Sequence, residues 1–288
     1  MNVLAGITLY NPDLSKLRDN ITAVQNQVSF LVCIDNGSRN IEDICKLLGN
    51  FPNVFLQKCE RNLGVAAALN LMFQYADTHG YDWVLTLDQD TVCPPDLISS
   101  YQKAADEIND PKLAVLCPIL TDRNFVRPVA YNGSHEQVSG CITSASLNRL
   151  DAWKAVGGFY EPLFIDYVDY DFCARLIEHD YRIERVNNVS ILHEIGHGEN
   201  HHFLWKTVTV LNHPPMRKYY MVRNHIFYMK IHKKVVNYGY EKAKLVFLFV
   251  KTALYEKDKT AKLKAMFRGK RDSKQLIEEY RKYELQNR

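Results

Sequence analysis

Short apolar runs alternate with helical stretches along the first third of the chain, and this alternation limits the fold more than any other feature. Each apolar run is about the length of one buried strand, and a polar turn and a segment with helical spacing follow it. Such alternation predicts an α/β fold with a mostly parallel, doubly wound sheet. Strands are expected at Val3–Leu9, Phe30–Ile34, Val54–Gln57 and Trp83–Leu87, and helices at Leu14–Val28, Ile41–Leu48 and Val65–Tyr75.

The rest of the sequence is less regular. Further strands are expected at Leu113–Pro118 and Val138–Ser146, with polar loops between them. From Arg217 onward the pattern is helical and rich in Tyr, Phe and Lys. We therefore predict three parts: an α/β half over residues 1–112, a second half of the same domain over residues 113–228, and a helical tail over residues 229–288.

The composition is that of a globular protein, and we expect the chain to stay in the cytoplasm. Hydrophobic residues make up 47% and charged residues 24% of the 288 residues, which suffices for a full core. The N-terminus lacks the basic start of a signal peptide, and no apolar run approaches the ~20 residues that span a bilayer. Seven scattered cysteines without a Cys-x-x-Cys pair indicate reduced thiols rather than disulfides or a zinc site.

Three of the expected strands end directly in polar residues: Tyr10-Asn11, Asp35-Asn36 and Asp88-Gln89-Asp90. In doubly wound sheets the ligand binds outside the carboxyl ends of the strands. The fold would therefore bring these residues into one crevice, although they lie far apart in the sequence.

Asp88 and Asp90 form a carboxylate pair at the end of the fourth expected strand. Alternation along an extended chain points two such side chains the same way. Two oxygen donors that face a cleft suit Mg²⁺ or Mn²⁺ bound together with a diphosphate. A solvated acidic turn is the alternative interpretation.

In combination and order, these motifs resemble the family-two inverting glycosyltransferases of the GT-A fold, and within them the bacterial rhamnosyltransferase branch. The resemblance covers roughly residues 1–230. It implies a Rossmann-like, mostly parallel central sheet with flanking helices, in which residues 1–112 bind the nucleotide sugar and residues 113–228 bind the acceptor. The motifs are Thr8-Leu9-Tyr10-Asn11, Ile34-Asp35-Asn36-Gly37-Ser38, Asn62-Leu63-Gly64 with Asn70, Leu87-Asp88-Gln89-Asp90-Thr91, Gly157-Gly158-Phe159, and Phe164 through Asp171.

The resemblance implies that Tyr10, Asn11 and Asp35 hold the base and ribose of the donor. An aromatic ring can stack on a base, and a carboxylate can accept from a ribose hydroxyl. Turn formation alone is the alternative for the Asn, Asp and Gly residues. The full predicted donor site is Thr8, Tyr10, Asn11, Asp35, Asn36, Asn62, Gly64, Asp88, Gln89 and Arg217.

Arg217 and Arg223 begin a helical segment that has counterparts in the rhamnosyltransferase branch. Either or both can clamp a phosphate in bidentate fashion. The alternative is that both arginines lie on a solvated helix face.

The predicted metal ligands are Asp90, Asp88 and His193. His193 matches a histidine that contacts the metal or diphosphate in many relatives, and imidazole is a sound ligand for Mn²⁺. The nearby His197, His201 and His202 invite a zinc interpretation, but their spacing favours a polar loop.

The expected catalytic base is a carboxylate, and Asp169 is the residue that matches the base of the family. The family's usual glutamate before it is replaced by Val168, which keeps Asp166 as a substitute. Asp171 is expected to start or cap a helix over Phe172–Glu178. Gly157, Gly158 and Phe159, with Asp166, are the predicted acceptor site, and a tight glycine turn is compatible with that role.

These assignments predict a metal-dependent glycosyltransferase that uses a dTDP or UDP sugar, with dTDP-rhamnose favoured, and a saccharide or lipid-linked saccharide acceptor of cell-surface polysaccharide synthesis. A UDP-hexose enzyme is the nearest alternative. A nucleotidyltransferase would need a glycine-rich, basic phosphate loop after the first strand, which is missing here. A non-catalytic saccharide- or lipid-binding module is the alternative from another class. No nucleic-acid partner is expected, and an oligomer remains open.

The segment from Lys230 to Arg271 is strongly basic. It has thirteen Lys and Arg against three acidic residues, in a chain whose net charge is only +3. The apolar stretch Leu245–Val250 lies within it and is too short to span a bilayer. This tail is expected either to dock on an anionic membrane surface or to pack its apolar face on the protein or a second subunit.

Overall fold

A computed structural model describes residues 1–121, 133–192, 199–203 and 206–286. The chain forms two compact units. The first comprises Met1–Glu161 and Phe172–His193, and the second comprises Pro162–Asp171 and Glu194–Arg288. The division expected from the sequence, at residues 112 and 228, stays a prediction.

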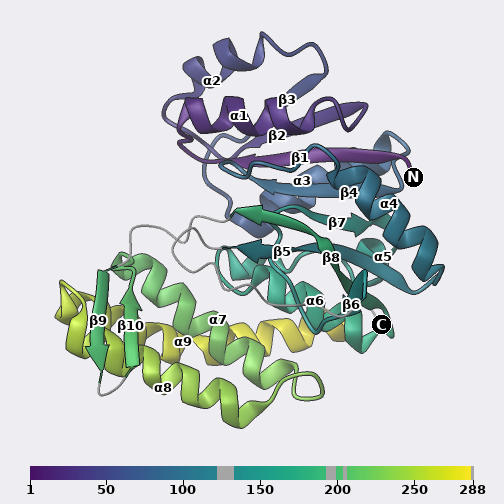
Figure 1. The fold of residues 1–288 in the computed structure, drawn as a ribbon. Helices are drawn as coiled ribbons and strands as arrows, with labels where there is room; N and C mark the ends of the chain where they lie inside the picture. The colour runs from purple at the N-terminus through teal and green to yellow at the C-terminus, as the bar shows by residue number, and fades with distance from the viewer. Residues whose placement is uncertain (122–132, 193–198, 204–205, 287–288) are drawn as a thin grey trace. The chain divides into compact units, whose positions relative to one another are not determined.

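The first unit is built on an eight-stranded sheet with the order β3-β2-β1-β4-β7-β5-β8-β6 (Figure 1). Six strands run in one direction, while β7 and β6 run against their neighbours, so the expected mostly parallel α/β sheet is confirmed. The strands are β1 (Val3–Leu9), β2 (Phe30–Asp35), β3 (Val54–Lys58), β4 (Trp83–Asp88), β5 (Leu113–Thr121), β6 (His135–Gln137), β7 (Ser146–Arg149) and β8 (Arg182–Leu192).

Helices flank this sheet, and their apolar residues complete its core. The strand β1 is buried along nearly its whole length, as expected for a parallel strand covered on both faces. Asp13 caps α1 by accepting hydrogen bonds from the backbone N–H groups of Ser15 and Lys16. The helices are α1 (Leu14–Val24), α2 (Ile41–Leu48), α3 (Val65–Thr78), α4 (Leu97–Ile108), α5 (Leu150–Ala155) and α6 (Val168–Glu178).

The strand expected over Val138–Ser146 is wrong. Only Ser146 belongs to a strand, as the first residue of β7, and residues 138–145 form irregular backbone. Ala145 has a φ of 56°, which an extended strand cannot contain. The Thr86 hydroxyl donates to the backbone oxygen of Thr143 at 2.6 Å. This segment is therefore held by a side-chain hydrogen bond and not by strand pairing.

The described part of the second unit contains a two-stranded antiparallel ribbon and three helices. The ribbon pairs β9 (Glu199–Phe203) with β10 (Lys206–Val210), so His201 and His202 lie in a strand and not in the expected polar loop. The helices are α7 (Pro215–Ile231), α8 (Tyr238–Tyr255) and α9 (Lys259–Gln286), which confirms the helical C-terminal tail. None of the described helices combines the length and apolar character needed to cross a bilayer.

A buried ion cluster joins the helices of the second unit. Glu256 accepts from Lys218 and, at 3.0 Å, from Lys262, and all three side chains are at most 3% exposed. Thr252 also lies within hydrogen-bonding distance of the Glu256 carboxylate. Each charged side chain therefore contacts one of opposite sign, as burial requires, and the two lysines share the single carboxylate.

Candidate functional site

The carboxyl ends of β1, β2 and β4 meet at one edge of the sheet (Figure 1). Leu9 is paired with Asp35, and Thr8 is paired with Asp88. The three polar strand ends predicted from the sequence are therefore neighbours in the fold. We call this group of strand ends, with the loops that continue them, the carboxyl edge.

Hydrogen bonds connect the loops of the carboxyl edge. The backbone N–H of Tyr10 donates to the side-chain oxygen of Gln89 at 2.9 Å, and that of Asn11 donates to the Ser38 hydroxyl at 2.8 Å. The Asn20 amide donates to the backbone oxygen of Asp88 at 2.7 Å. The side chain of Tyr10 remains 46% exposed, so its ring is available to stack on a base.

Asp35 and Asn36 are buried at this edge and engaged with backbone. The Asp35 carboxylate lies 3.2 Å from the backbone nitrogens of Gly37 and Ser38, as in an Asx-type turn. The Asn36 side chain donates to the backbone oxygen of Gly64 and accepts from the backbone N–H of Leu63. These contacts with the backbone are the ones expected if Asp35 and Asn36 serve to form the turn.

Asn62 and Gly64 stand at the start of α3, where the sequence predicted a close approach to the donor. The Asn62 side chain accepts from the backbone N–H of Gly64 at 2.9 Å. Gly64 is the N-cap of α3 and has a φ of 91°, a conformation that favours glycine. The backbone there is held by side chains from two loops.

Asp88 ends β4, and Gln89 and Asp90 lie in a turn. The backbone N–H of Thr91 donates to the backbone oxygen of Asp88 at 3.2 Å, so the alternation rule expected to align the two carboxylates does not apply. Asp88 is half-buried and Asp90 is exposed. The Asp90 carboxylate makes no hydrogen bond or ion pair within the described part of the chain.

The donor set of the carboxyl edge fits a hard cation only in part. Asp88 and Asp90 supply carboxylate oxygens, the ligands that Mg²⁺ and Mn²⁺ prefer. Among the described residues, however, no three His, Cys, Asp or Glu side chains are grouped as a metal site. A cation bound there would need donors from a diphosphate, and the predicted ligand His193 lies outside the described residues.

The loop Gly157-Gly158-Phe159 is held from two sides within the first unit. The Asn70 side chain contacts both the N–H and the carbonyl oxygen of Phe159, at 2.8 and 2.9 Å. Arg175 donates to the backbone oxygen of Gly158. Gly158 has a φ of 76°, and a Cβ there would lie 2.9 Å from the Asn70 oxygen, so only glycine fits.

Asp166 lies in a strained loop of the second unit. Phe164, Asp166 and Tyr167 all have positive φ angles between 63° and 66°, where non-glycine residues are rare. Arg217, which the sequence predicts to bind the donor, lies 3.2 Å from the Asp166 carboxylate. Burial raises the pKa of Asp166, and the neighbouring Arg217 opposes that shift only in part.

Asn224 holds the same loop in place and was not predicted as a site residue. It is fully buried on α7, and its side-chain nitrogen lies 2.8 to 2.9 Å from the backbone oxygens of Leu163, Ile165 and Asp166. Arg223 donates to the backbone oxygens of Pro162 and Leu163. The adjacent Arg-Asn pair was visible in the sequence, but the loop it binds was not.

Asp169 and Asp171 lie in the first turn of α6, which begins at Val168. Asp169 is half-buried and accepts from the backbone N–H of Tyr170. Asp171 is fully buried 3.0 Å from the ring of His232. The expectation that Asp171 starts or caps a helix from Phe172 is therefore wrong, because the helix begins at Val168, four residues before Phe172.

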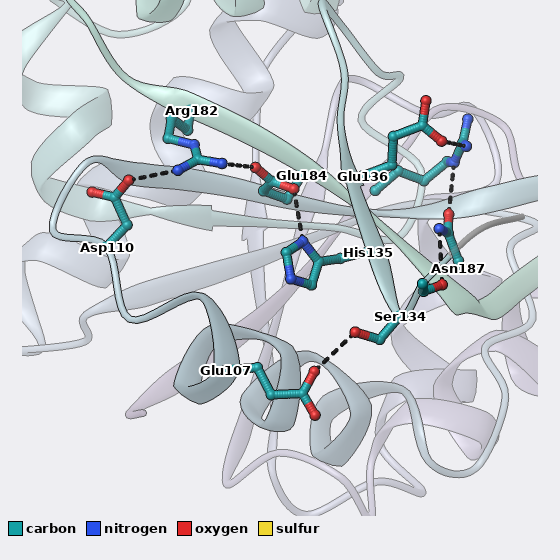
Figure 2. Close-up of polar contacts among 10 residues, drawn as sticks. Glu107, Asp110, Ser134, His135, Glu136, Arg182, Glu184 and Asn187 are labelled. Carbon is teal, nitrogen blue, oxygen red and sulfur yellow. Dashed lines mark hydrogen bonds and ion pairs between the residues drawn. The ribbon is translucent and has the colours of Figure 1, made fainter.

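A separate polar cluster lies near the amino end of β8 (Figure 2). The buried Glu184 accepts from Arg182 at 2.7 Å and lies 3.0 Å from His135. Arg182 also donates to Asp110 at 2.9 Å. Ligands of such sheets bind at the opposite, carboxyl ends of the strands. We therefore interpret this cluster as one that stabilises the pairing of the edge strand β6 with β8.

The chain is similar to two glycosyltransferases of known structure. The structure of GalNAc-T7 with UDP, GalNAc and Mn²⁺ is 12% identical, with a TM-score of 0.59 over 81% of this chain. The structure of S. aureus TarS 1–349 with UDP-GlcNAc is 16% identical, with a TM-score of 0.52 over 89% of this chain and 74% of that one. The present chain spans about half of the GalNAc-T7 chain, 49%. These similarities show that the fold is GT-A.

The sequence comparisons identify the family. The chain is 28% identical to the dTDP-rhamnosyl transferase RfbF of Shigella flexneri over 242 residues, which cover 77% of this chain and 78% of that protein. The model of the family "Glycosyl transferase family 2" matches residues 5–151, just over half of the sequence, and includes the whole carboxyl edge. The chain therefore belongs to glycosyl transferase family 2.

Proposed function

We propose that this chain transfers a sugar from a nucleoside-diphosphate donor to an acceptor hydroxyl, with inversion at the anomeric carbon. The observation that carries the proposal is the pairing of Leu9 with Asp35 and of Thr8 with Asp88. This register gathers an exposed aromatic ring, buried amides and two carboxylates at the edge of a GT-A sheet. Membership of glycosyl transferase family 2 supports the reaction class.

In this proposal the carboxyl edge binds the donor nucleotide. Tyr10 stacks on the base, and Asp35 and Asn11 contact the ribose or the base edge. Thr8, Asn36, Asn62, Gly64 and Gln89 would shape this donor site through the backbone contacts described above. We propose dTDP-rhamnose as the donor because the Shigella flexneri relative is named a dTDP-rhamnosyl transferase. A UDP-hexose is the alternative, because TarS and GalNAc-T7 were solved with UDP or a UDP sugar.

We propose that Asp90 and Asp88, with His193, hold Mg²⁺ or Mn²⁺ when a diphosphate is bound. The cation would neutralise the charge that develops on the leaving diphosphate. Asp90 suits this role because its carboxylate is exposed and keeps its lone pairs free among the described residues. The presence of Mn²⁺ in the GalNAc-T7 structure, which has the same fold, supports metal dependence of this chain.

The acceptor hydroxyl must lose a proton as it attacks, and we propose Asp169 as the general base. Asp166 is the alternative, because burial raises its pKa above that of an ordinary aspartate and so makes it a stronger base. Its contact with Arg217 favours a second role, in which Asp166 holds that guanidinium ready for a phosphate. We also propose Gly157, Gly158 and Phe159 as acceptor-binding residues.

The proposed acceptor is a saccharide or lipid-linked saccharide, and the tail from Lys230 to Arg271 would contact an anionic membrane surface. One face of α8 packs on α7 and α9 through Leu245, Leu248 and Phe249. Other apolar residues of this helix remain exposed, among them Val246 at 55% and Val250 at 37%. The packed face of α8 therefore supports the interpretation that the tail packs on the protein, and its exposed apolar residues support docking on a membrane.

Hydrolysis of a nucleotide sugar in the presence of Mn²⁺ tests the proposed chemistry. The wild-type chain should release nucleoside diphosphate slowly even without acceptor, because water can replace the hydroxyl. Asp90→Asn should lose this activity and keep its fold, since the change is isosteric at an exposed position. A chain that binds the donor with no release, in wild type as in Asp90→Asn, would be a non-catalytic binding module.

A further inference from the structure

The three helices of the second unit enclose an apolar groove. It has a volume of about 770 Å³, within the ~300–1,000 Å³ of pockets that take small ligands. The buried side chains of Ile226 and Met229 on α7 form part of its lining. All of the lining residues belong to α7, α8 and α9 of the second unit.

Several apolar side chains that line the groove are unusually exposed to solvent. Val246 and Val250 of α8 are 55% and 37% exposed, and Phe267 of α9 is 60% exposed. Phe267 and Phe249 have ring centroids 5.4 Å apart, so an aromatic pair joins the two walls. A continuous apolar surface of this kind marks a binding site more often than a plain solvent face.

The mouth of the groove is positively charged. Lys230, Lys242, Lys270, Arg271 and Lys274 all line it, and they come from all three helices. The ammonium groups of the four lysines make no ion pair or hydrogen bond within the described part of the chain. Arg271 is paired with Asp272. The groove is thus an apolar slot with uncompensated cations around it.

We propose that this groove binds one acyl chain of an anionic membrane phospholipid, with the lipid phosphate held by the cations at the mouth. The apolar side chains of the groove would stabilise an acyl chain, and the four lysines, which make no ion pair with any described residue, would stabilise a phosphate. The inference rests on the proposed membrane contact of the tail and goes beyond it, because it names one site and one occupant. It does not depend on the sugar-transfer chemistry.

Vesicle co-sedimentation of the full chain tests the proposal. Vesicles of phosphatidylcholine with phosphatidylglycerol should bind the protein, and vesicles of phosphatidylcholine alone should not. Lys270→Gln with Lys274→Gln should weaken binding roughly 25-fold, at about fivefold for each basic residue near the surface. Both lysines are exposed, so the fold should be unaffected.

Matched variants separate the groove from a general surface effect. Lys259→Gln with Lys264→Gln removes two exposed lysines of the same helix that do not line the groove, and should weaken binding clearly less. Phe267→Ser should weaken binding, whereas Phe247→Ser, an exposed aromatic of α8 outside the groove, should have little effect. If a groove variant and its control lose the same amount of vesicle binding, the groove is not the binding site. The membrane contact of the tail would still stand.

Three further outcomes would overturn the proposal. The first is an absence of binding to anionic vesicles even at low salt. The second is release of the protein from vesicles by inorganic phosphate at constant ionic strength, which would identify free phosphate as the ligand. The third is a dimer in analytical ultracentrifugation that Phe267→Ser dissociates, which would identify a second copy of the chain as the occupant. Nucleotide-sugar hydrolysis measured without vesicles shows whether each variant retains its activity.

Discussion

The side-chain nitrogen of Asn224 lies 2.9 Å from the backbone oxygen of Asp166, in a loop where three residues have left-handed backbone conformations. Such a loop needs external contacts, because each of these conformations costs about 1–3 kcal/mol. Asn224 supplies them from α7, where it is fully buried.

Asn224→Ala should therefore lower kcat by up to about 100-fold while the KM for the donor changes little, because small displacements of a reacting group are costly. Asn148→Ala is the matched control, since Asn148 is also buried and hydrogen-bonded to backbone but lies on β7. It should lower the melting temperature without a selective loss of kcat. Similar kinetic losses in both variants would reduce Asn224 to a structural role.

Asp169→Asn should lower the rate of transfer by about 10²–10⁴-fold, the usual effect of losing a general base, with donor affinity nearly unchanged. Asp151→Asn, at an exposed position on α5, serves as the control and should leave the rate intact. If Asp166→Asn is inactive and Asp169→Asn is active, the two roles are exchanged. In that case activity should decline with acid at a higher pH than for an ordinary aspartate, because burial raises the pKa of Asp166.

The sheet and the carboxyl edge were predictable because local rules determine them. The bounds of β1 and α2 match the expected residues, since apolar runs there end at polar or glycine-containing turns. The same rules placed Tyr10, Asp35 and Asp88 together, because parallel strands end at one edge.

Features that depend on distant contacts were not predictable. Residues 138–145 have the composition of a strand, but hydrogen bonds from Thr86 and a left-handed Ala145 exclude one. The contact of Asn224 with Leu163 joins positions 61 residues apart, and no periodicity signals it. Likewise, the contact of Arg217 with Asp166 joins positions far apart in the sequence, and the prediction that Arg217 binds the donor phosphate stays a prediction.

Removal of divalent metal should weaken binding of dTDP to the wild-type chain and have little effect on Asp90→Asn. The loss should be at least the ~10–100-fold that removal of an outer-shell partner costs a metal site. Calorimetric titration of dTDP with Mn²⁺ or with chelator measures both. Equal metal dependence in the two proteins would contradict the assignment of Asp90.

Glu256→Gln should lower the free energy of unfolding by about 3–5 kcal/mol, because it leaves Lys218 and Lys262 buried without their anion. Urea denaturation monitors this loss. Glu199→Gln is the control, as its pair with Lys257 is largely exposed and should contribute less than about 1 kcal/mol. A loss below that of the control would show that the cluster does not depend on its carboxylate.

The most direct test of the account is a donor panel with Mn²⁺ that includes dTDP-rhamnose, UDP-glucose and UDP-galactose, with the initial rate of nucleoside-diphosphate release as the measurement. The account predicts release from dTDP-rhamnose at the highest rate, and loss of that release in Asp90→Asn. Preference for a UDP-hexose would contradict the proposed donor, and no release from any sugar nucleotide would contradict the proposed reaction.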